Sequence, residues 1–421
     1  MKNPLKPQTV HFQDPPRVLV VGYNGANNTG AEALLQSDIE DLRAVLGSEV
    51  QLTVPTINEA NLRRYVKGSA VRIVPWPSTV FPALPGLVRE NDLILLVEGS
   101  TYMDTWTSVM LWVYLWTTNL AHTMGKPCLA YAVDAGDVSA LNRHLVRMEA
   151  SKTDLIIARA RAAADRLRAF GVNAPIEVTA DNAFNFRPDS ADVGWVQGTW
   201  PEAASGLVGL AVVNFYLWPV VMRPWGREKD CYKWPFYYTR SPERDRAIEV
   251  LADGYAALAD DLIAKRGKSI ALICMEQLDE PLARMIYSRM THADRARVFS
   301  SREYNASQMT SLLRSLDLLV TSRYHACVLS MAAQVPQIAV GHDLRLKTIY
   351  TELGLRDGFF VEPDSMKMFA AIKDNAERLL ADPTIEKDAL RRGYEEHLAK
   401  AKRNRELLRG FVAAHGWEVV G

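Results

Sequence analysis

Short apolar runs alternate with helical stretches along almost the whole chain. The run "RVLVV" is followed by the Gly-rich "GYNGANNTG" and then by apolar residues at helical spacing up to Leu46. Comparable runs occur in "EVQLTVPT", "AVRIVPW", "DLILLVEGS", "KPCLAYAVDAG" and "TDLIIARA". Strands that are apolar throughout are typical of parallel sheets with helices on both faces. The alternation therefore predicts α/β structure built from right-handed βαβ units.

The alternation occurs in two series. After a short closing strand in "APIEVTADNAFNF", residues 191–207 lose periodicity and gain Pro, Gly and Ser. A second series follows in "GLVGLAVVNF", "SIALICME", "RVFSS", "LLVTS" and "QIAVGHD". We predict an N-terminal Rossmann-like domain over 1–190, a linker over 191–207, and a C-terminal Rossmann-like domain with terminal helices over 208–421. Loops after the strands of both domains should line a central cleft.

Composition excludes several classes of protein. Lys+Arg and Asp+Glu number 49 each, so no large basic field favours nucleic acid, and an anionic ligand must be bound by a few local arginines. No CxxC pair or His/Asp cluster has the spacing of a metal site. Cys128, Cys274 and Cys327 stand in apolar runs and are predicted to be small buried residues, consistent with a reducing cytoplasm.

The N-terminal segment and one hydrophobic run bear on the localisation of the protein. The N-terminal "MKNPLKPQTVHFQDPP" lacks the apolar core of a signal peptide. The run "VMLWVYLWTTNLAHTMG" is shorter than a typical spanning helix and carries polar residues in its second half, so we predict a buried helix. Both observations favour a cytoplasmic protein.

The stretch "TSRYHACVLSMAAQVPQIAVGHD", residues 321–343, lies between two predicted strands. Arg323 offers a planar fork for a carboxylate or phosphate, and His325 can exchange a proton near neutral pH. Both precede or begin a predicted helix, whose N-terminus adds positive potential. A buried structural histidine is the alternative for His325. His342 and Asp343 could face the same cleft, and we expect Lys347 to pair with Asp343 along a helix.

Loops of the first domain supply further candidates for polar contacts. The Gly-rich loop offers side-chain amides and helix-start N–H groups to a sugar or anion, with capping of a turn as the alternative. After the fourth predicted strand, "VEGSTYMD" provides carboxylates that could bind hydroxyls or act as a base, or could cap a helix. The residues concerned are Asn24, Asn27, Asn28, Glu98, Ser100 and Asp104.

Three further features are less decisive. Arg159 ends the sixth predicted strand, where an arginine can face a ligand. For Asp181, capping or interdomain structure is the preferred interpretation. The Pro-rich segment "NFYLWPVVMRPWGREKDCYKWPFYYTRSPERD" is unusually aromatic. It could hold sugar faces, form a lid, or be an ordered insertion or a subunit contact.

Taken together, the stretches "GYNGANNTGAEALL", "VEGSTYMD", "GKPCLAYAVDAG", "IIARARAAADRLRAFGV…VTADNAF" and "VTSRYHACVLSMAAQVPQIAVGHDLRLKTIYTELGL" resemble the polysaccharide pyruvyl transferase family. They span nearly the whole chain in family order, and the last is the most specific. The resemblance implies a glycosyltransferase-B-like fold with two Rossmann-like domains facing a cleft. It also implies transfer of pyruvyl from phosphoenolpyruvate to two hydroxyls of a sugar, forming a cyclic ketal and releasing phosphate.

The resemblance also implies roles for residues. Arg323, with Tyr324 beside it, and Arg159 would bind phosphoenolpyruvate, and His325 would donate a proton or assist phosphate departure. Asp104 or Glu98 would be a base, and the first-domain loops would hold the acceptor. The partners would be phosphoenolpyruvate, as co-substrate without a further cofactor, and a glycan or lipid-linked sugar. A lipid-linked acceptor implies that the protein associates peripherally with a membrane. Whether the protein forms a homo-oligomer stays open.

Some positions depart from the family pattern. Arg159 matches an Arg-Asp-x-x-Ser stretch, but Ala160 replaces the Asp, and Ala163 or Ala164 replaces the Ser. Many members have glycine where Glu98 stands. An arginine common near Asn214 is missing, and Arg223 is expected to replace it as a phosphoenolpyruvate ligand. "YAVDAG" also differs from the more usual "GIGP".

The sequence is also compatible with other functions. A glycosyltransferase that uses a nucleotide sugar on the same fold is the main alternative, although no clear nucleotide-clamping pattern is visible. A non-catalytic glycan-binding protein is a third hypothesis. A dehydrogenase is disfavoured because GxGxxG and a following ribose-binding acidic residue are absent.

Overall fold

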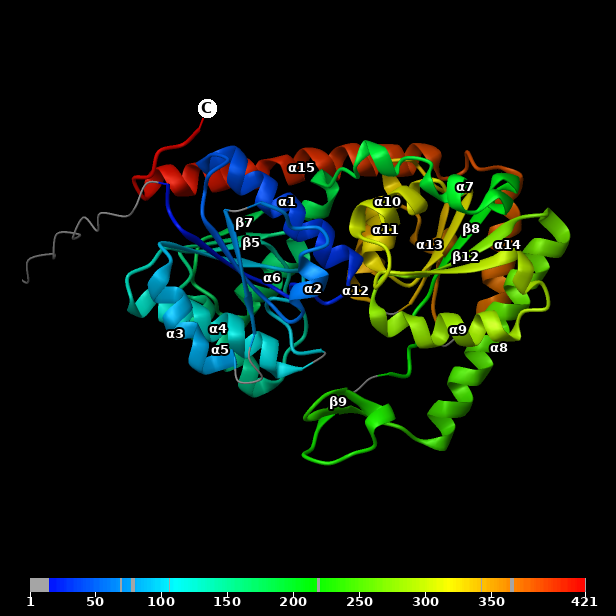
Figure 1. Cartoon of the computed structure of the whole chain (residues 1–421), viewed down its shortest axis with the longest axis horizontal. Helices are drawn as coiled ribbons and strands as arrows, with labels where there is room; N and C mark the ends of the chain where they lie inside the picture. The colour runs from blue at the N-terminus through cyan, green and yellow to red at the C-terminus, as the bar shows by residue number, and fades with distance from the viewer. Residues whose placement is uncertain are drawn as a thin grey trace, which may run out of the picture.

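The computed structural model describes residues 15–68, 70–76, 80–105, 107–217, 220–341, 343–363 and 367–420. It contains two separate parallel sheets, each flanked by helices, and a small antiparallel sheet that projects from the second (Figure 1). The predicted α/β fold with two Rossmann-like domains is confirmed.

The first sheet has the strand order β3-β2-β1-β4-β5-β6-β7. Every side chain of β1 and of β4 is buried, because helices cover both faces of the sheet. Its strands are β1 Val18–Val21, β2 Leu52–Thr56, β3 Val71–Pro75, β4 Leu93–Val97, β5 Cys128–Val133, β6 Leu155–Ala158 and β7 Ile176–Val178. Its helices are α1 Thr29–Leu46, α2 Glu59–Leu62, α3 Val80–Glu90, α4 Ser108–Thr123, α5 Ala140–Ala150 and α6 Arg161–Phe170.

The second sheet has the strand order β13-β12-β8-β14-β15-β16. Its strands are β8 Leu207–Ala211, β12 Ser269–Cys274, β13 Ala296–Ser300, β14 Leu318–Thr321, β15 Gln337–Val340 and β16 Phe360–Val361. Its helices are α8 Pro242–Arg266, α9 Glu280–Arg289, α10 Ala306–Arg314, α11 Tyr324–Met331, α12 Leu344–Glu352, α13 Arg356–Phe359 and α14 Met368–Ala381.

Two segments connect the sheets. The stretch predicted as a linker carries the short helix α7 Trp195–Thr199, and the Trp195 indole donates to the Gln308 carbonyl on α10. The last helix, α15 Lys387–Ala414, runs along both domains (Figure 1). Leu390 lies in the core of the second sheet, whereas Leu408 lies in a core of the first. Burial at both ends of α15 therefore favours a fixed arrangement of the two domains.

The apolar run predicted as a buried helix forms α4. Its inner side chains are buried, but Trp112 and Trp116 are partly exposed. None of the helices in the described ranges has the length and apolar character needed to cross a membrane. The predicted burial of Cys128, Cys274 and Cys327 is confirmed, and all four cysteines are free thiols.

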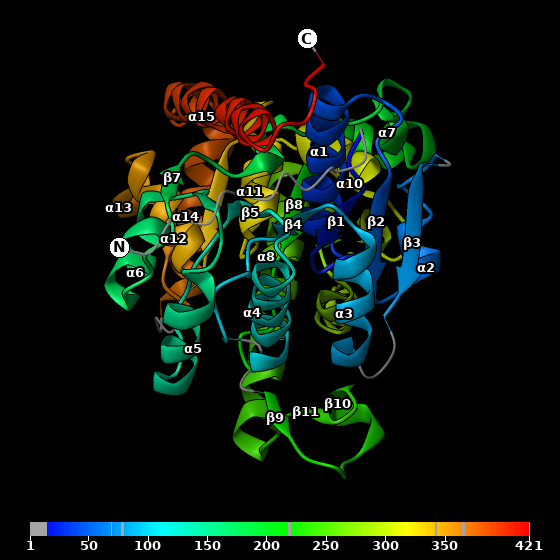
Figure 2. The ribbon, with the colours of Figure 1, turned by 90° about the vertical axis from the view of Figure 1, so that its left-hand side faces the viewer.

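The aromatic segment forms a three-stranded antiparallel sheet of order β10-β11-β9. Its strands are β9 Val220–Met222, β10 Cys231–Lys233 and β11 Phe236–Tyr238. We call residues 220–241 the aromatic arm. Figure 2 shows the arm at one end of the molecule, beyond the helices of the first domain.

Candidate active site

A cavity of about 970 Å³ lies between the two domains. We call it the central cavity. Its walls include residues that directly follow strands of both sheets: Glu98 and Ser100 after β4, Arg159 after β6, Glu276 after β12, and Arg323, Tyr324 and His325 after β14. Carboxyl ends of parallel strands therefore supply both walls, as expected for open α/β sheets.

Arg323 is the N-cap residue of α11 and is held by two carboxylates of the same domain. Its Nη1 lies 3.1 Å from Oε2 of Glu276, and its Nε donates to Oδ2 of Asp279 at 3.0 Å. Both acids are buried, being 5% and 2% exposed. Burial raises the pKa of both carboxyls above the ordinary range, although the Arg323 guanidinium opposes the rise. Arg323 is thus fixed in place and still lines the central cavity.

His325 lies in the first turn of α11 and contacts the first domain. Its Nε2 is 3.6 Å from Oδ2 of Asp181, which is an ion-pair distance rather than a hydrogen bond. Its ring lies so close to Gly30 that a Cβ there would be 2.1 Å from Nδ1. Burial lowers the pKa of His325, while Asp181 opposes the shift. The glycine at the start of α1 therefore permits the imidazole to enter the domain interface.

Tyr324 lies between two arginines. The guanidinium carbons of Arg159 and Arg345 are 5.1 Å and 5.7 Å from the centre of its ring. Arg345 donates to both carboxylate oxygens of Asp343, with Nη2 to Oδ2 at 2.6 Å and Nε to Oδ1 at 2.9 Å. As at any helix start, the first N–H groups of α11 lack acceptors within the helix. Two guanidinium groups and a helix N-terminus therefore meet on this wall, an arrangement suited to an anion.

Arg159 lines the central cavity but is committed to the protein's own acids. Its Nη1 donates to Asp181 at 2.5 Å, and its Nη2 lies 2.9 Å from Asp134. All three residues are buried. Gly99 permits this position, because a Cβ there would be 2.3 Å from Nη1. Burial opposes ionisation of Asp181, but Arg159 outweighs this effect and holds the pKa of Asp181 well below its ordinary value.

Glu98 has an unusual backbone conformation on the opposite wall. Its φ is +118°, a region that favours glycine, and its Oε1 accepts a hydrogen bond from the Gly99 N–H at 3.0 Å. Burial raises the pKa of Glu98 to about 7, against the opposing effect of Arg159. Glycine would adopt this backbone conformation without strain. Ser100 lines the cavity beside Glu98.

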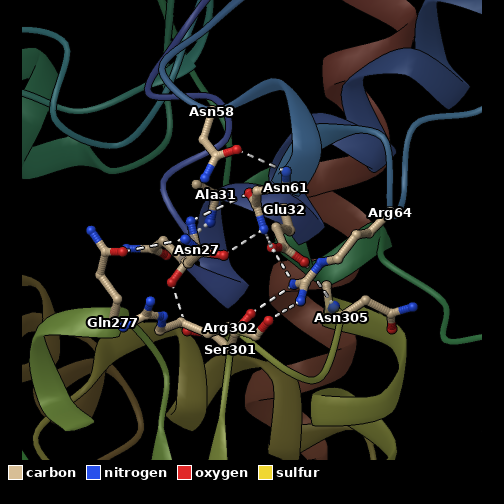
Figure 3. A network of polar contacts seen from close by, with 12 residues as sticks. Asn27, Ala31, Glu32, Asn58, Asn61, Arg64, Gln277, Ser301, Arg302 and Asn305 are labelled. Atoms are coloured by element: carbon tan, nitrogen blue, oxygen red, sulfur yellow. Dashed lines mark hydrogen bonds and ion pairs between the residues drawn. The ribbon is translucent and has the colours of Figure 1, made fainter.

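The asparagines of the Gly-rich loop mainly hold the structure together. Asn24 donates to the Pro55 carbonyl at 3.2 Å, and Asn28 caps α1 by accepting from the Ala31 N–H at 3.1 Å. Asn27 reaches the second domain and donates to Gln277 at 3.2 Å (Figure 3). Of the three, only Asn28 is among the described residues that line the central cavity.

A polar network around Asn27 joins the domains (Figure 3). Glu32 of α1 accepts from the Ala306 N–H at the start of α10 at 3.0 Å, and Arg64 donates to the Ser301 carbonyl at 2.7 Å. The Asn27 carbonyl accepts from the Ser301 hydroxyl at 2.6 Å. The loop predicted to bind a ligand therefore serves mostly as an interdomain contact.

Besides Asn24 and Asn27, two further predicted site residues are not among the described residues that line the central cavity. Asp104 accepts hydrogen bonds from the Ser139 N–H at 2.9 Å and the Asn142 amide at 2.6 Å, so it fixes the start of α5. Arg223 stands on the aromatic arm, where its guanidinium carbon is 4.9 Å from the centre of the Tyr237 ring. The structure thus does not bring Asp104 or Arg223 to the wall formed by Arg323.

Several residues of the site were not singled out from the sequence. Asp134 and Glu276 follow strand ends and could have been found by that signal, whereas Arg345 lies in the first turn of α12. The expected Asp343–Lys347 pair is wrong, because Lys347 pairs with Glu362 at 2.9 Å and Asp343 with Arg345. Asp181 does cap, accepting from the Ala183 N–H at 2.8 Å, but it also meets His325. His342 lies outside the described residues.

Comparison with known proteins identifies the family of this chain. The sequence profile of the polysaccharide pyruvyl transferase family matches residues 28–343, more than half of the chain. The chain belongs to the polysaccharide pyruvyl transferase family. The matched region contains most of the residues that line the central cavity, including Arg159, Arg323 and His325. No curated protein matches the sequence.

Solved structures of low identity share the fold. HepE of Anabaena, in complex with UDP-glucose, has a TM-score of 0.54 at 13% identity, covering 95% of this chain and 98% of that chain. Staphylococcus aureus MnaA with UDP has a TM-score of 0.60 at 11% identity, covering 94% and 96%. The UDP-GlcNAc 2-epimerase of Neisseria meningitidis has 0.59 at 9% identity, covering 94% and 100%. These similarities establish a glycosyltransferase-B-like fold for this pyruvyl transferase family member.

Proposed function

We propose that the protein transfers a pyruvyl group from phosphoenolpyruvate to two hydroxyls of a sugar in a glycan or glycan precursor. The products are a cyclic ketal and inorganic phosphate. The observation that carries the proposal is the wall of the central cavity at the start of α11. There Arg323, Arg345 and a helix N-terminus line the same cavity as the imidazole of His325.

The donor is a small molecule that carries both a carboxylate and a phosphate. Arg323 and Arg345 each present a planar fork that suits such groups. Arg323 pairs with Glu276 and Asp279, and Arg345 pairs with Asp343. Burial raises the pKa of Glu276 and Asp279, so both acids take up a proton more readily than an ordinary carboxylate. Proton uptake would release Arg323 to the arriving anion.

His325 has the chemistry of the proton donor. The methylene carbon of phosphoenolpyruvate takes a proton from the imidazolium, and a sugar hydroxyl oxygen forms a bond to the neighbouring carbon. A second hydroxyl then forms the second C–O bond as the bond to phosphate breaks. One hydroxyl proton restores His325, and the other leaves with the phosphate. Asp181, 3.6 Å from Nε2, opposes the lowering of the His325 pKa by burial and so helps the ring to carry the proton that a general acid donates.

The acceptor would lie against the first-domain wall. Glu98 and Ser100 face the same cavity and offer a carboxylate and a hydroxyl to sugar hydroxyls. The volume of about 970 Å³ leaves room for a sugar beside the donor. Four free thiols suit a reducing cytoplasm, which is where we place the reaction.

Phosphate release and product mass test the proposal. The protein is incubated with phosphoenolpyruvate and a panel of glycans and lipid-linked sugars, and the acceptor is examined for one added pyruvyl ketal. His325→Gln and Arg323→Lys should each abolish phosphate release while the thermal midpoint stays close to that of the parent. Lys is used because Arg323→Ala would leave two buried carboxylates unpaired. Arg284→Ala, at a side chain 61% exposed on α9, is the matched control. Parent-like turnover in both site variants would refute the assignment.

A nucleotide-sugar transferase on the same fold is the second candidate. The fold similarity to HepE in its UDP-glucose complex is the observation that favours it. The same glycan panel is therefore also offered UDP-glucose and other nucleotide sugars. Addition of a sugar mass without any pyruvyl transfer would decide for this candidate.

A further inference from the structure

The aromatic arm exposes large apolar side chains to solvent. Met222 is 73% exposed, Trp225 74% and Trp234 66%, although side chains of this size are usually half buried or more. The three lie close together. The Trp234 indole donates to the Pro224 carbonyl at 3.4 Å, and Met222 pairs with Phe236 across the sheet, two residues after Trp234. The arm therefore ends in a compact apolar patch.

Arginines stand beside this patch. A second cavity, of about 260 Å³, lies on the arm and is lined by Arg223, Arg227 and Arg240. Asp230 pairs with Arg227 at 2.5 Å and lies 3.5 Å from Arg240, which also pairs with Asp245 at 2.8 Å, so the three arginines have two acids as partners. The Nε of Arg223 is buried and has no hydrogen-bond partner within the described part of the chain. The cavity thus has a positive excess and an unused donor.

The charge of the arm contrasts with that of the chain. Residues 220–241 contain five Lys or Arg and two Asp or Glu, a net charge of +3, whereas the whole chain is neutral. Tryptophan is enriched where proteins meet the membrane–water interface, and clustered basic residues attract anionic lipid headgroups. Both features occur together here on a segment of fewer than thirty residues.

We propose that the aromatic arm docks the protein on an anionic membrane surface. Trp225, Trp234 and Met222 enter the interfacial region, and the three arginines contact lipid phosphates. A second copy of the chain fits less well, because a two-fold contact would place the same positive segment against itself. A neutral glycan would not require the excess charge.

The arm also borders the central cavity. Phe236 lines that cavity, and its cross-strand partner Met222 shares the same face of the small sheet. Docking would therefore hold the cavity near the lipid headgroups, where a lipid-linked acceptor is found. This consequence rests on the proposed function, but the docking itself does not.

Vesicle sedimentation tests the proposal without donor or acceptor. The full chain is mixed with vesicles of phosphatidylcholine alone or with about one third phosphatidylglycerol, at about 0.1 M and about 0.5 M NaCl. We expect binding only to the anionic vesicles, weakened at high salt. Trp225→Ser/Trp234→Ser should weaken binding by about tenfold or more, and Arg227→Gln by about fivefold. Val193→Ser, at a side chain 73% exposed elsewhere, should bind like the parent.

Three results would overturn the proposal. The first is equal sedimentation with and without anionic vesicles. The second is vesicle binding that stays unchanged in both double variants, Trp225→Ser/Trp234→Ser and Met222→Ser/Arg227→Gln. The Met222→Ser/Arg227→Gln variant is included because it changes only exposed side chains that do not contact Pro224. The third is loss of a dimer in the tryptophan variant by sedimentation velocity without any lipid dependence, which would make the arm an interface between copies. Because no turnover is measured, failure here leaves the pyruvyl transfer proposal untouched.

Discussion

Replacement of Glu98 by glycine and by glutamine separates two costs that the structure combines at this residue. Glu98 has φ +118°, and burial raises its pKa from an ordinary 4.5 to about 7. Glu98→Gln keeps the side chain's size and the backbone strain but removes the charge. Glu98→Gly removes the charge and also relieves the strain. The difference between the two variants therefore reports the relief of backbone strain, less the contacts that the side chain makes, such as the hydrogen bond from the Gly99 N–H.

The size of each effect follows from the structure. A pKa raised by about 2.5 units corresponds to about 3 kcal/mol, which partial exposure of Glu98 reduces to about 2 kcal/mol. Because the folded state holds a proton that the unfolded state loses, stability falls as pH rises from 4.5 to about 7. Relief of a strained φ adds about 1–3 kcal/mol, offset by about 0.5–1 kcal/mol of glycine entropy in the unfolded chain.

Urea unfolding at a series of pH values measures both effects. Near pH 4, Glu98→Gln should match the parent and Glu98→Gly should be more stable by about 1 kcal/mol. Near pH 8, the gains should grow to about 2 and about 3 kcal/mol. Gln334→Gly, at an uncharged residue with φ +55°, is the control and should show no pH-dependent gain. Parallel curves for parent and Glu98→Gln would refute the buried-charge reasoning, and equal stability of the two Glu98 variants would refute the strain.

Three further predictions concern other parts of the site. Gly30→Ala should displace His325 and lower phosphate release about 100-fold, whereas Gly86→Ala, where nothing lies within 4 Å, should not; equal rates would contradict the contact. Arg159→Leu leaves Asp134 and Asp181 buried without their partner and should cost about 3–5 kcal/mol in urea unfolding, so a loss below about 1 kcal/mol would count against the buried cluster. Asp104→Ala should cost about 1 kcal/mol through the start of α5 and leave phosphate release unchanged, and loss of turnover without loss of stability would instead support Asp104 as a base.

Much of the architecture could be predicted because its signals are local. A run such as Val18–Val21 is apolar throughout and is followed by residues at helical spacing, a pattern that is typical of a buried parallel strand. The aromatic arm was harder, since its strands are three residues long and show neither period clearly. The sequence predicted a segment that holds sugar faces, forms a lid, or is an ordered insertion or a subunit contact, but it did not predict these strands.

For the site, the sequence predicts where some residues lie but not what they contact. The position of Arg323 and His325 at the end of a strand follows from the sequence, because the carboxyl ends of parallel strands meet at one edge. The role of an arginine does not follow, because it depends on its neighbours in space. Arg159 is paired with acids 25 and 22 residues away, and Arg323 with one 44 residues away.

The sequence by itself therefore determined the element order, the two-domain α/β class, the buried cysteines and the family. Each of these depends on periodicity or on stretches of contiguous residues. Only the tertiary structure decided that Gly30 receives His325, that Asn27 joins the domains, and that Arg223 belongs to the arm. The physical reason is that charge pairing and close packing are set by residues that are distant in the chain and adjacent only after folding.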